Sequence, residues 1–437
     1  MDLKKTACLL FFLVFIIANC RAQDTLLTLK DAVEIALKNN YHIQIAKNNS
    51  AVSQNNVTPG AAGMLPSLTG NFSQSNSVQN VNQTTSSGPK TLTNNKTNNL
   101  SIGPNLNWTI FNGFGMFANY DQLKQFNQLS QVMLRDTVLT TVSDVMATYY
   151  NLINQYQQLK ALKGAIKISR TQYRYANDKF QVGTASKLDV LNAQVNLNTD
   201  TANYLSQLQQ FKTAKVQMNQ LLVRDLQTQF SVADTIIVDQ KLTLGDILTR
   251  AEDQNQVILA AQINKRLSEI NLRQVKAGRY PQVALNGGYS YTNSSNPAGF
   301  ARAQNTHGFT YGITASINIF NGFNQSRLEK NAKLGIENAE LNQKQALLNV
   351  RAQINNLYIS YLSGLDLIKL GESNVMIAKR NLEISLDKYK LGNITPLEIR
   401  EAERNYLDAE STFFAAQYQS KIAEITLKQI TNSIDIQ

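Results

Sequence analysis

Two kinds of hydrophobic periodicity alternate along this chain, and both occur twice in the same order. Over residues 100–110 and 309–319, apolar and polar residues alternate with a period of two, which is typical of a β-strand with two different faces. Over residues 138–159 and 347–382, apolar residues step by three and four positions, which is typical of coiled-coil helices. The pattern therefore predicts a duplicated chain in which strands are followed by long helices.

The same four-residue motif lies at both changes of period. Each copy reads Phe-Asn-Gly-Phe, and the backbone of Asn-Gly tolerates the positive φ angles of abrupt turns. Two copies with matched flanking patterns favour a strand-to-helix junction over an ordinary single turn. The junction residues are Phe111, Asn112, Gly113, Phe114, Phe320, Asn321, Gly322 and Phe323.

Each half is expected to contribute one β-hairpin. A first strand opens at residues 65–68 and again at 280–283, and the segments 73–99 and 292–307, rich in Asn, Thr and Ser, are expected to be solvent-exposed loops. The returning strands contain no charged residue over about ten alternating positions, which is the length of a membrane-spanning strand. A strand of a soluble sandwich would alternate in the same way, so the pattern alone leaves both interpretations open.

Two long helices are predicted after the junctions, at residues 115–182 and 324–391, each ~100 Å long. Shorter helices are predicted over residues 26–57, 186–222 and 244–277. A further helix follows the second long one. A long helix would thus lie against two stacked helices of about half its length.

Both long helices are predicted to end in the same type of tight turn. A Gly in each turn suits a left-handed helix C-cap. A Ser or Thr followed three residues later by an acid has the spacing of a helix N-cap and its N3 residue, and Pro396 suits the first helical position. These features predict sharp helical hairpins. The turn residues are Gly183, Ser186, Asp189, Gly392, Thr395 and Glu398.

The N-terminal segment has the features of a secretory signal peptide. Lys4 and Lys5 precede an apolar run at residues 9–18, which is too short to span a membrane, and Ala22 precedes the expected cleavage point. Lipidation at Cys20 is the alternative processing route.

The chain is expected to divide into a signal peptide, 1–22, and two structural repeats, 23–242 and 243–437. Each repeat would consist of a helix, two strands, a long helix and a half-length helix. The first repeat ends near a β-favouring patch at residues 232–238, which would form a small belt between the half-length helices.

The chain offers no constellation for catalysis or for a cofactor. Cys8 and Cys20 lie in the targeting segment, and His42 and His307 have no partners at ligand spacing, so no metal site is expected. No Gly-rich phosphate-binding loop is present. The formal net charge of +11 is scattered along helices rather than gathered in a tract with aromatic residues. The sequence therefore predicts no enzyme, no cofactor and no nucleic-acid partner.

Four strands in each chain cannot close a membrane barrel. Unpaired strand edges are not tolerated in lipid, and the smallest closed bacterial barrels use about eight strands. A cyclic trimer would supply twelve strands, and the helices would continue as a hollow coiled-coil cylinder. Trp108 and Tyr311 fall on the apolar faces of their strands and are expected to face lipid. This arrangement favours a conduit over a binding pocket.

These features together resemble the TolC-like outer-membrane efflux family. The resemblance rests on the signal peptide, the tandem halves, both junction motifs and both Gly-containing turns, and it covers nearly the whole chain after residue 22. It implies a mixed α and β protomer of four transmembrane strands and long coiled-coil helices. Three protomers would form a homotrimer with a 12-strand barrel in the outer membrane and an α-helical tunnel in the periplasm. The implied partners are outer-membrane lipid, a periplasmic adaptor (membrane fusion protein) and an inner-membrane pump.

The resemblance also implies roles for the two turns. They would form the periplasmic tip on which the adaptor docks, and acids six and nine positions after each Gly would narrow the entrance as a gate. Glu398 and Glu401 occupy both positions after Gly392, whereas the first turn has Asp189 followed by Asn192. Helix capping by Asp189 and Glu398, and a solvated surface position for Glu401, are the alternatives. The docking-turn residues are Val182, Gly183, Thr184, Leu391, Gly392 and Asn393.

The expected function is a passive exit duct of a tripartite efflux or type I secretion system, crossing the periplasm and the outer membrane. The partner pump would supply the driving energy. A structural or adhesive trimeric coiled coil of the outer membrane is the alternative. Such proteins usually carry one contiguous C-terminal anchor, whereas here the strand pairs are divided between the two halves.

Overall fold

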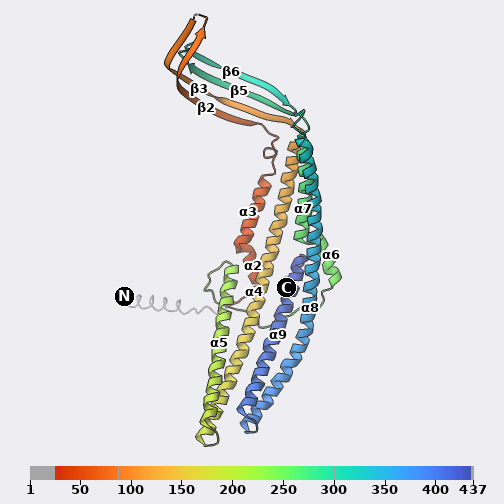
Figure 1. The fold of residues 1–437 in the computed structure, drawn as a ribbon. Helices are drawn as coiled ribbons and strands as arrows, with labels where there is room; N and C mark the ends of the chain where they lie inside the picture. The colour runs from red at the N-terminus through yellow and green to blue at the C-terminus, as the bar shows by residue number, and fades with distance from the viewer. Residues whose placement is uncertain (1–24, 87, 300, 435–437) are drawn as a thin grey trace, which may run out of the picture. The chain divides into compact units, whose positions relative to one another are not determined.

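The structure, a computed structural model, describes residues 25–86, 88–299 and 301–434 (Figure 1). The chain forms two compact units, and each unit takes segments from both halves. The expected signal peptide, its cleavage after Ala22 and the lipidation of Cys20 lie outside the described residues. Unit 1 comprises the described parts of Met1–Lys47, Leu134–Ile258 and Leu347–Gln437, and unit 2 comprises those of Asn48–Met133 and Leu259–Ala346.

Unit 2 contains a four-stranded antiparallel sheet with the order β2-β3-β5-β6. β2 (Ser67–Thr85) and β3 (Gly88–Asn112) form the hairpin of the first half, and β5 (Gln282–Ser295) and β6 (Ala303–Ser316) form that of the second. Because β3 pairs with β5, the two hairpins join into one sheet whose edges are β2 and β6. The prediction of one hairpin in each half is confirmed.

The strands extend further than the hydrophobic alternation indicated. The expected loop at residues 73–99 is wrong, because β2 and β3 remain paired as far as Thr85 and Gly88. The expected loop at residues 292–307 is also wrong for most of its length, because β5 and β6 pair there. Backbone hydrogen bonds hold these ladders whatever the side chains are, so polar runs continue as strand without an apolar face.

The second returning strand ends earlier than its pattern predicts. β6 stops at Ser316, whereas alternation continues to Ile319. β3 has a partner on both sides and continues to Asn112, where it pairs with Gln282 of β5. β6 is an edge strand, and in the part of the chain that the structure describes no strand lies beyond it to hold residues 317–319 in a ladder.

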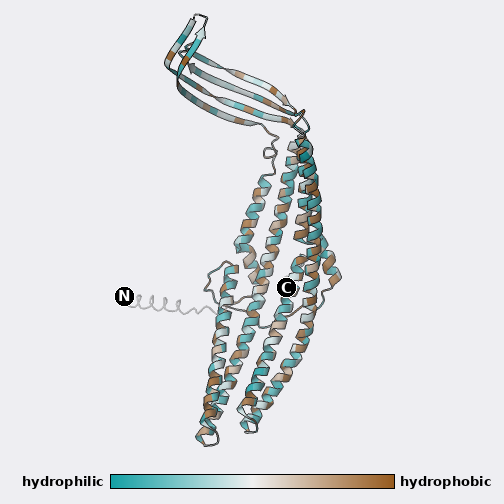
Figure 2. Ribbon diagram, viewed as in Figure 1, coloured by the Kyte–Doolittle hydropathy of each residue, from teal (hydrophilic) through white to brown (hydrophobic). Residues whose placement is uncertain are grey.

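The pairing register gathers the apolar positions of all four strands on one face of the sheet. One row of opposed residues runs across Leu68, Leu106, Gly287 and Tyr311. The other face carries Thr, Asn, Ser and Gly, and polar and apolar residues alternate along the strands in Figure 2. The large apolar side chains exposed on this sheet include Leu68, Phe72, Ile102, Trp108, Phe309, Tyr311 and Ile313.

Two helices of equal length follow the junctions. α4 (Gly115–Gln181) and α8 (Asn324–Lys390) have 67 residues each, which makes each helix ~100 Å long. Each turns back into a 35-residue helix, α5 (Lys187–Leu221) or α9 (Pro396–Ile430). These helices agree with the predicted ones. In the part of the chain that the structure describes, no helix is long and apolar enough to cross a membrane.

The helices expected over residues 26–57 and 244–277 are each divided in two. α2 (Leu29–Asn39) is followed by α3 (Tyr41–Asn55), and α6 (Leu244–Gln254) is followed by α7 (Gln256–Ala277). The prediction of one continuous helix in each place is therefore wrong. The single residue at each break is Asn, with an extended backbone.

The two asparagines break these helices in the same way. The Oδ1 atom of Asn40 accepts a hydrogen bond from the backbone N–H of His42 at 2.9 Å, which caps α3. Its Nδ2 group donates to the carbonyl of Leu221, the last residue of α5, at 3.1 Å. Asn255 caps α7 likewise and donates to the carbonyl of Ile430 at the end of α9 at 3.1 Å. Each Asn therefore joins the end of one half-length helix to the start of another.

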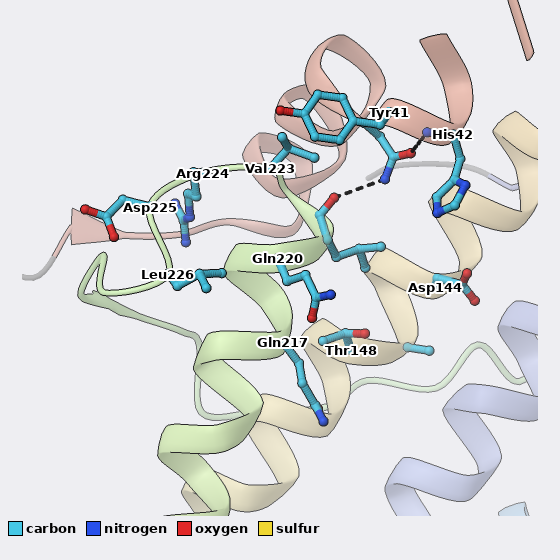
Figure 3. Close-up of a pocket in the computed structure, with 13 residues that line it drawn as sticks. Tyr41, His42, Asp144, Thr148, Gln217, Gln220, Val223, Arg224, Asp225 and Leu226 are labelled. Atoms are coloured by element: carbon cyan, nitrogen blue, oxygen red, sulfur yellow. Dashed lines mark hydrogen bonds between the residues drawn. The ribbon is translucent and has the colours of Figure 1, made fainter. Parts of the chain in front are cut away.

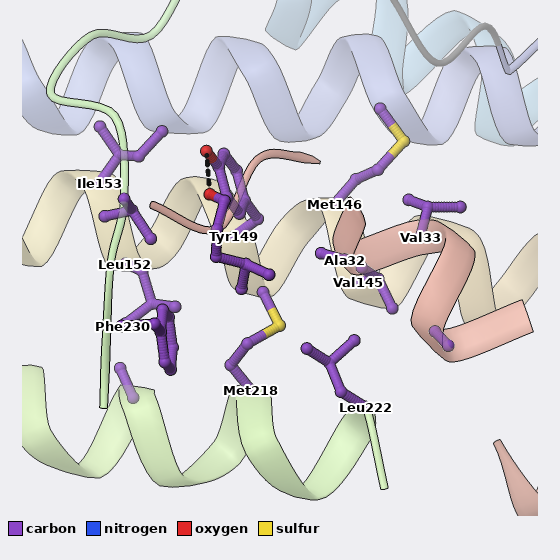
Figure 4. Close-up of a cluster of buried hydrophobic side chains, with 14 of the residues drawn as sticks. Ala32, Val33, Val145, Met146, Tyr149, Leu152, Ile153, Met218, Leu222 and Phe230 are labelled. Atoms are coloured by element: carbon purple, nitrogen blue, oxygen red, sulfur yellow. Dashed lines mark hydrogen bonds between the residues drawn. The ribbon is translucent and has the colours of Figure 1, made fainter. Parts of the chain in front are cut away.

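Unit 1 contains two apolar cores at corresponding positions of the two halves. In the first, side chains of α4 pack against α2, α5 and Phe230, and the Tyr149 hydroxyl donates to the carbonyl of Leu27 at 3.1 Å (Figure 4). In the second, Ile354 and Tyr361 of α8 pack with α6 and α9. The middle part of each predicted apolar stripe is confirmed as core, from Val142 to Leu152 on α4 and from Leu347 to Tyr361 on α8, whereas Tyr156 is exposed.

Two glycines of α8 allow the close approach of a second helix. A Cβ atom at Gly364 would lie 1.9 Å from the Oγ atom of Ser420 on α9. A Cβ atom at Gly371 would lie 3.1 Å from a ring carbon of Phe413 on the same helix. The small residues on this stripe therefore allow α8 and α9 to pack closely.

The β-favouring patch at residues 232–238 forms no strand. Only β4 (Phe230–Ser231) is paired, in parallel with β1 (Thr25–Leu26). The segment that follows is held instead by helix side chains, since the Tyr361 hydroxyl donates to the carbonyl of Asp239. The patch supplies apolar side chains to the core, while hydrogen bonds from helices replace those of a strand partner.

Candidate functional site

Both predicted hairpin turns have the same backbone geometry. Gly183 and Gly392 adopt φ angles of +79° and +78°. The N–H of Thr184 donates to the carbonyl of Lys179 at 2.8 Å, and the N–H of Asn393 makes the corresponding bond in the second turn at 2.9 Å. A bond of this span around a left-handed Gly closes a helix C-terminus sharply, so the predicted turns are confirmed.

The predicted gate residues Asp189 and Glu398 complete reciprocal N-terminal caps. A carboxylate oxygen of Asp189 accepts hydrogen bonds from the backbone N–H and the hydroxyl of Ser186 at 3.0 and 2.8 Å. Glu398 accepts the same pair from Thr395 at 2.7 and 2.8 Å. These bonds, that from the backbone N–H first, hold the pKa of Glu398 below its usual range. The capping interpretation applies to both acids, while Glu401 lies exposed three residues further along α9.

Each hairpin exposes two apolar side chains at its end. Val182 and Leu391 are 74% and 75% exposed, and Leu188 and Leu397 are also exposed. The four residues occupy corresponding positions in the two turns. Apolar side chains in water gain free energy when they are covered, so these matched patches can pack against a protein partner.

A lysine connects the two hairpins. The Nζ group of Lys179 donates to the carbonyl of Tyr389 at 3.5 Å and lies 5.3 Å from the centre of its ring. A Cβ atom at Gly392 would lie 3.8 Å from the same Nζ group. Lys179 at the end of α4 therefore contacts the last turn of α8.

A buried charged cluster ties α4, α5 and α9 together. The guanidinium of Arg400 on α9 donates to both carboxylate oxygens of Asp200 on α5, each at 2.8 Å. Ser169 on α4 donates to Asp200 at 2.5 Å. Arg400 and Gln172 of α4 both donate at 3.2 Å to one oxygen of Glu403, whose other oxygen is buried with no hydrogen-bond partner among the described residues.

Glu403 is the most perturbed acid of this cluster. Burial, and then the neighbouring Asp200 carboxylate, raise the pKa of Glu403 to about 7, although Arg400 and Gln172 act against them. Sequence reasoning missed the cluster. A signal was available, because Asp200 lies in a row of α5 residues that are spaced seven apart and face another helix. A charged residue in such a row indicates a specific polar partner. The seam residues are Ala193, Asp200, Gln207 and Ala214.

Both junction motifs turn through two consecutive residues of positive φ. The angles are +67° at Gly113 and +69° at Phe114, and +66° and +61° at their counterparts Gly322 and Phe323. A non-Gly residue rarely adopts this conformation. Packing of the two Phe rings stabilises it, with centroids 5.2 Å apart in the first motif and 5.4 Å in the second.

The Asn of each motif caps the helix that follows. The Oδ1 atom of Asn112 accepts a hydrogen bond from the N–H of Met116 at 2.9 Å. Asn321 accepts one from the N–H of Gln325 at 3.3 Å. The motif therefore combines a tight turn with a helix start, as the switch of period predicted.

A pocket lies beside the end of α5 and the start of α3 (Figure 3). Its lining includes Tyr41, His42, Asp144 and Arg224, and burial raises the pKa of Asp144. The other lining side chains are mainly amide and apolar. Within residues 25–86, 88–299 and 301–434, no group of three His, Cys, Asp or Glu residues could hold a metal ion. The pocket thus belongs to the helix break at Asn40, which is among its lining residues.

Comparison with known proteins places the chain in a family. The family described as "Outer membrane efflux protein" matches residues 32–223 and 247–433. The outer membrane protein TolC of Vibrio cholerae is 23% identical over 305 residues, which cover 67% of this chain and 68% of that protein. The cation efflux system protein CusC of Escherichia coli is 24% identical over 350 residues, covering 76% and 72%.

Solved structures share the fold. The Campylobacter jejuni CmeC outer membrane channel aligns with a TM-score of 0.78 at 19% identity, over 93% of this chain and 85% of that one. The open state of the Neisseria gonorrhoeae MtrE outer membrane channel aligns with a TM-score of 0.71 at 17% identity, over 92% and 88%. Because the family profile covers most of the sequence, the chain belongs to the outer membrane efflux protein family and is an outer-membrane efflux channel protein.

Proposed function

We propose that the protein is the passive exit duct of a tripartite efflux or type I secretion system. It acts as a homotrimer that joins a 12-strand barrel in the outer membrane to an α-helical tunnel across the periplasm. The observation that carries this proposal is the sheet of unit 2, which has an exposed apolar face and two edges without a partner strand among the described residues.

The apolar face suits lipid rather than water. Phe309, Tyr311 and Ile313 are each at least 70% exposed, and covering a large apolar side chain contributes roughly 1.5–3 kcal/mol. The only charged residues in the four strands are Lys90 and Lys96, both in the part of β3 furthest from its junction. The sheet next to the junctions is therefore compatible with the hydrocarbon layer.

The two edges of the sheet require further strands. Unpaired backbone groups in lipid cost several kcal/mol each, so only a closed barrel is stable there. Three copies supply twelve strands, an even number within the range of bacterial barrels. The Thr, Asn, Ser and Gly residues of the other face then line a polar lumen, which suits a water-filled conduit.

The two hairpin turns are proposed as the docking site of a periplasmic adaptor that connects to an inner-membrane pump. The exposed apolar residues Val182 and Leu391 support this role, since they flank Gly183 and Thr184 in one turn and Gly392 and Asn393 in the other. The acids Asp189, Glu398 and Glu401 next to the turns are proposed to form the gate.

The two halves, 23–242 and 243–437, are proposed to be structural repeats. Matched structural features at corresponding residues support this proposal. The same junction geometry, Gly-containing hairpin turn with its capping box, and Asn-capped helix break occur at corresponding positions of the two halves. A duplicated protomer gives the trimer a near six-fold arrangement of similar hairpins.

Single-channel conductance after reconstitution into planar bilayers tests the proposal. A duct gives discrete conductance steps with block by divalent cations, because three copies of each acid confine negative charge at the entrance. Glu398→Gln, which can keep the cap, Glu401→Gln and the double variant should each weaken this block. A trimer without conductance would favour the structural or adhesive alternative, and unchanged block in all three variants would limit these acids to capping and surface roles.

A further inference from the structure

We propose that a pocket between α4 and α9 binds a linear aliphatic diamine as a dication, with one ammonium group on Glu403 and the other on Glu410. The pocket lies within unit 1, and its lining comes from these two helices and from Asp234 and Thr235. Its volume is about 450 Å³, which falls within the range of about 300–1,000 Å³ for small-molecule sites. Such a site is a function beyond that of a conduit, because one chain supplies all of its lining.

Two residues that line the pocket each have a buried oxygen atom that lacks a hydrogen-bond donor. Glu403 is 0% exposed, and its Oε1 atom has no partner among the described residues. The Oε1 atom of Gln157 is likewise buried and without a partner in that part of the chain, although the Nε2 group of Gln157 donates to the carbonyl of Asp234 at 2.8 Å. A buried acceptor without a donor costs free energy, so the pocket favours a ligand that donates hydrogen bonds.

The charges of the lining residues favour a cation. Glu403 and Glu410 line the pocket together with an ion pair, in which the Nζ atom of Lys160 lies 3.6 Å from a carboxylate oxygen of Asp234. The side chains of this pair are 67% and 58% exposed, so the two charges balance one another in contact with solvent. Burial raises the pKa of Glu410, against the effects of a Tyr406 hydrogen bond, Lys379 and Lys160. The two glutamates are therefore the acids that a bound cation can stabilise.

The groups around Glu403 make binding depend on pH. Arg400 of α9 donates to Glu403 but is shared with Asp200 of α5, and the other donor is the neutral amide of Gln172 on α4. Burial, and then Asp200, raise the pKa of Glu403 to about 7. Because an ammonium group pairs with the ionised carboxylate, the dication binds more tightly above pH 7 than below it, and its binding lowers this pKa.

The spacing of the two glutamates suits a diamine rather than a metal ion. Glu403 and Glu410 lie seven residues apart on α9, which places them ~10 Å apart along one face of the helix. In the part of the chain that the structure describes, no three His, Cys, Asp or Glu residues are grouped so that they could hold a metal ion. A linear dication can contact both carboxylates, whereas a single ion cannot.

The remaining lining suits an aliphatic chain with ammonium ends. Ala161 and Leu407 supply apolar surface, and the aromatic rings of Tyr406 and Phe414 attract cations. Gly164 lies in the interior of α4, where Gly is less stable than Ala. A Cβ atom at this position would meet nothing within 4 Å, so packing within the described chain does not require the Gly. Its missing side chain leaves one wall of the pocket open.

Isothermal titration calorimetry of the purified protein in a non-ionic detergent tests the site with three probes of equal length. Cadaverine carries two ammonium groups, pentylamine carries one and pentanediol carries none. At pH 8 we expect cadaverine to bind at least tenfold more tightly than pentylamine, and pentanediol to give no saturable heat. At pH 6 cadaverine should bind about tenfold more weakly than at pH 8, since only about a tenth of Glu403 is then ionised.

Three substitutions separate the two carboxylates from the shape of the pocket. Glu403→Gln should weaken cadaverine binding at least tenfold at pH 8 and remove its pH dependence. Glu410→Gln should reduce the affinity for cadaverine to that for pentylamine and leave pentylamine binding unchanged. Gly164→Leu, which fills the open wall, should abolish binding, whereas Gly164→Ala should retain it. Asp408→Asn removes an exposed acid of the same helix outside the pocket and is the matched control, with unchanged affinity.

Equal cadaverine affinities of the wild type and Glu403→Gln, both folded by circular dichroism, overturn the site. Equal affinities for all three probes overturn the recognition of charge, and an unchanged cadaverine affinity in Glu410→Gln overturns the second ammonium contact. The absence of saturable binding by any probe overturns the proposal as a whole and leaves a pocket that holds only water. If Glu403→Gln does not fold, full binding by Gly164→Leu overturns the site by the same comparison.

Discussion

Replacing Glu403 by Gln should remove a pH dependence of stability that the wild-type protein carries. Glu403 is fully buried, and its pKa is raised from 4.5 to about 7. The folded protein therefore keeps a proton on Glu403 between pH 4.5 and about 7, where an unfolded chain releases it. Because the folded state binds this proton and the unfolded state does not, the free energy of unfolding falls as the pH rises from 4.5 to about 7. Above pH 7 it falls no further on account of Glu403.

The magnitude follows from the size of the shift. Each unit of pKa corresponds to 1.36 kcal/mol, so the charged form of Glu403 costs the folded state about 3 kcal/mol at pH 8. Gln has nearly the same shape, can accept the hydrogen bonds of Arg400 and Gln172, and carries no charge. Glu403→Gln should match the wild type near pH 4.5 and exceed its stability at pH 8 by about that amount.

Thermal unfolding followed by circular dichroism in detergent, at pH 5, 6, 7 and 8, measures the effect. The difference in melting temperature between Glu403→Gln and the wild type should grow from near zero to several degrees across this range. Glu401→Gln, an exposed substitution two residues away, removes the same charge and should give no such trend. Parallel pH profiles for the wild type and Glu403→Gln, or a less stable variant at pH 8, would contradict a raised pKa of Glu403 in the folded protein.

Three further substitutions follow from the sheet and the helix contacts. Ile313→Arg on the apolar face should reduce the yield of heat-sensitive trimer on gels, at a cost of ~2–4 kcal/mol near the bilayer midplane, while Thr314→Arg on the other face is tolerated better; equal yields would contradict the assigned faces. Gly364→Ala should lower the free energy of unfolding by about 1–3 kcal/mol relative to the control Gly335→Ala, whose new Cβ atom meets nothing within 4 Å. Identical melting temperatures of the two variants would exclude the close helix contact. Asn255→Ala should lower stability by ~1–2 kcal/mol in chemical unfolding, and Asn255→Asp, which keeps only the cap acceptor, should fall between it and the wild type.

The hairpin turns and the junctions could be predicted from the sequence because their causes are local. Gly392 in a left-handed conformation, the Thr395 cap and the switch of period at each Phe-Asn-Gly-Phe motif depend on residues within a few positions of one another. The lengths of α4 and α8 could be predicted for the same reason, because a junction motif marks the start of each helix and a Gly-containing turn marks its end.

The parts that the sequence did not reveal depend on contacts between distant segments. The helix break at Asn40 needs the carbonyl of Leu221, and the pKa of Glu403 needs Asp200 from another helix. The polar ends of β2 and β3 form strands because their backbones hydrogen-bond to each other. Backbone pairing of this kind leaves no hydrophobic pattern in the sequence. Asp200 could have been found from its place in a buried heptad seam, but its partner Arg400 could not be identified without the packing of α5 against α9.

The most direct test of the central claim is the native mass of the purified protein in detergent. β2 and β6 form two unpaired edges of the described sheet, so we expect a complex of three chains that dissociates only on heating or denaturation. A stable, folded single chain with β2 and β6 still forming the edges of its sheet would contradict the trimeric barrel.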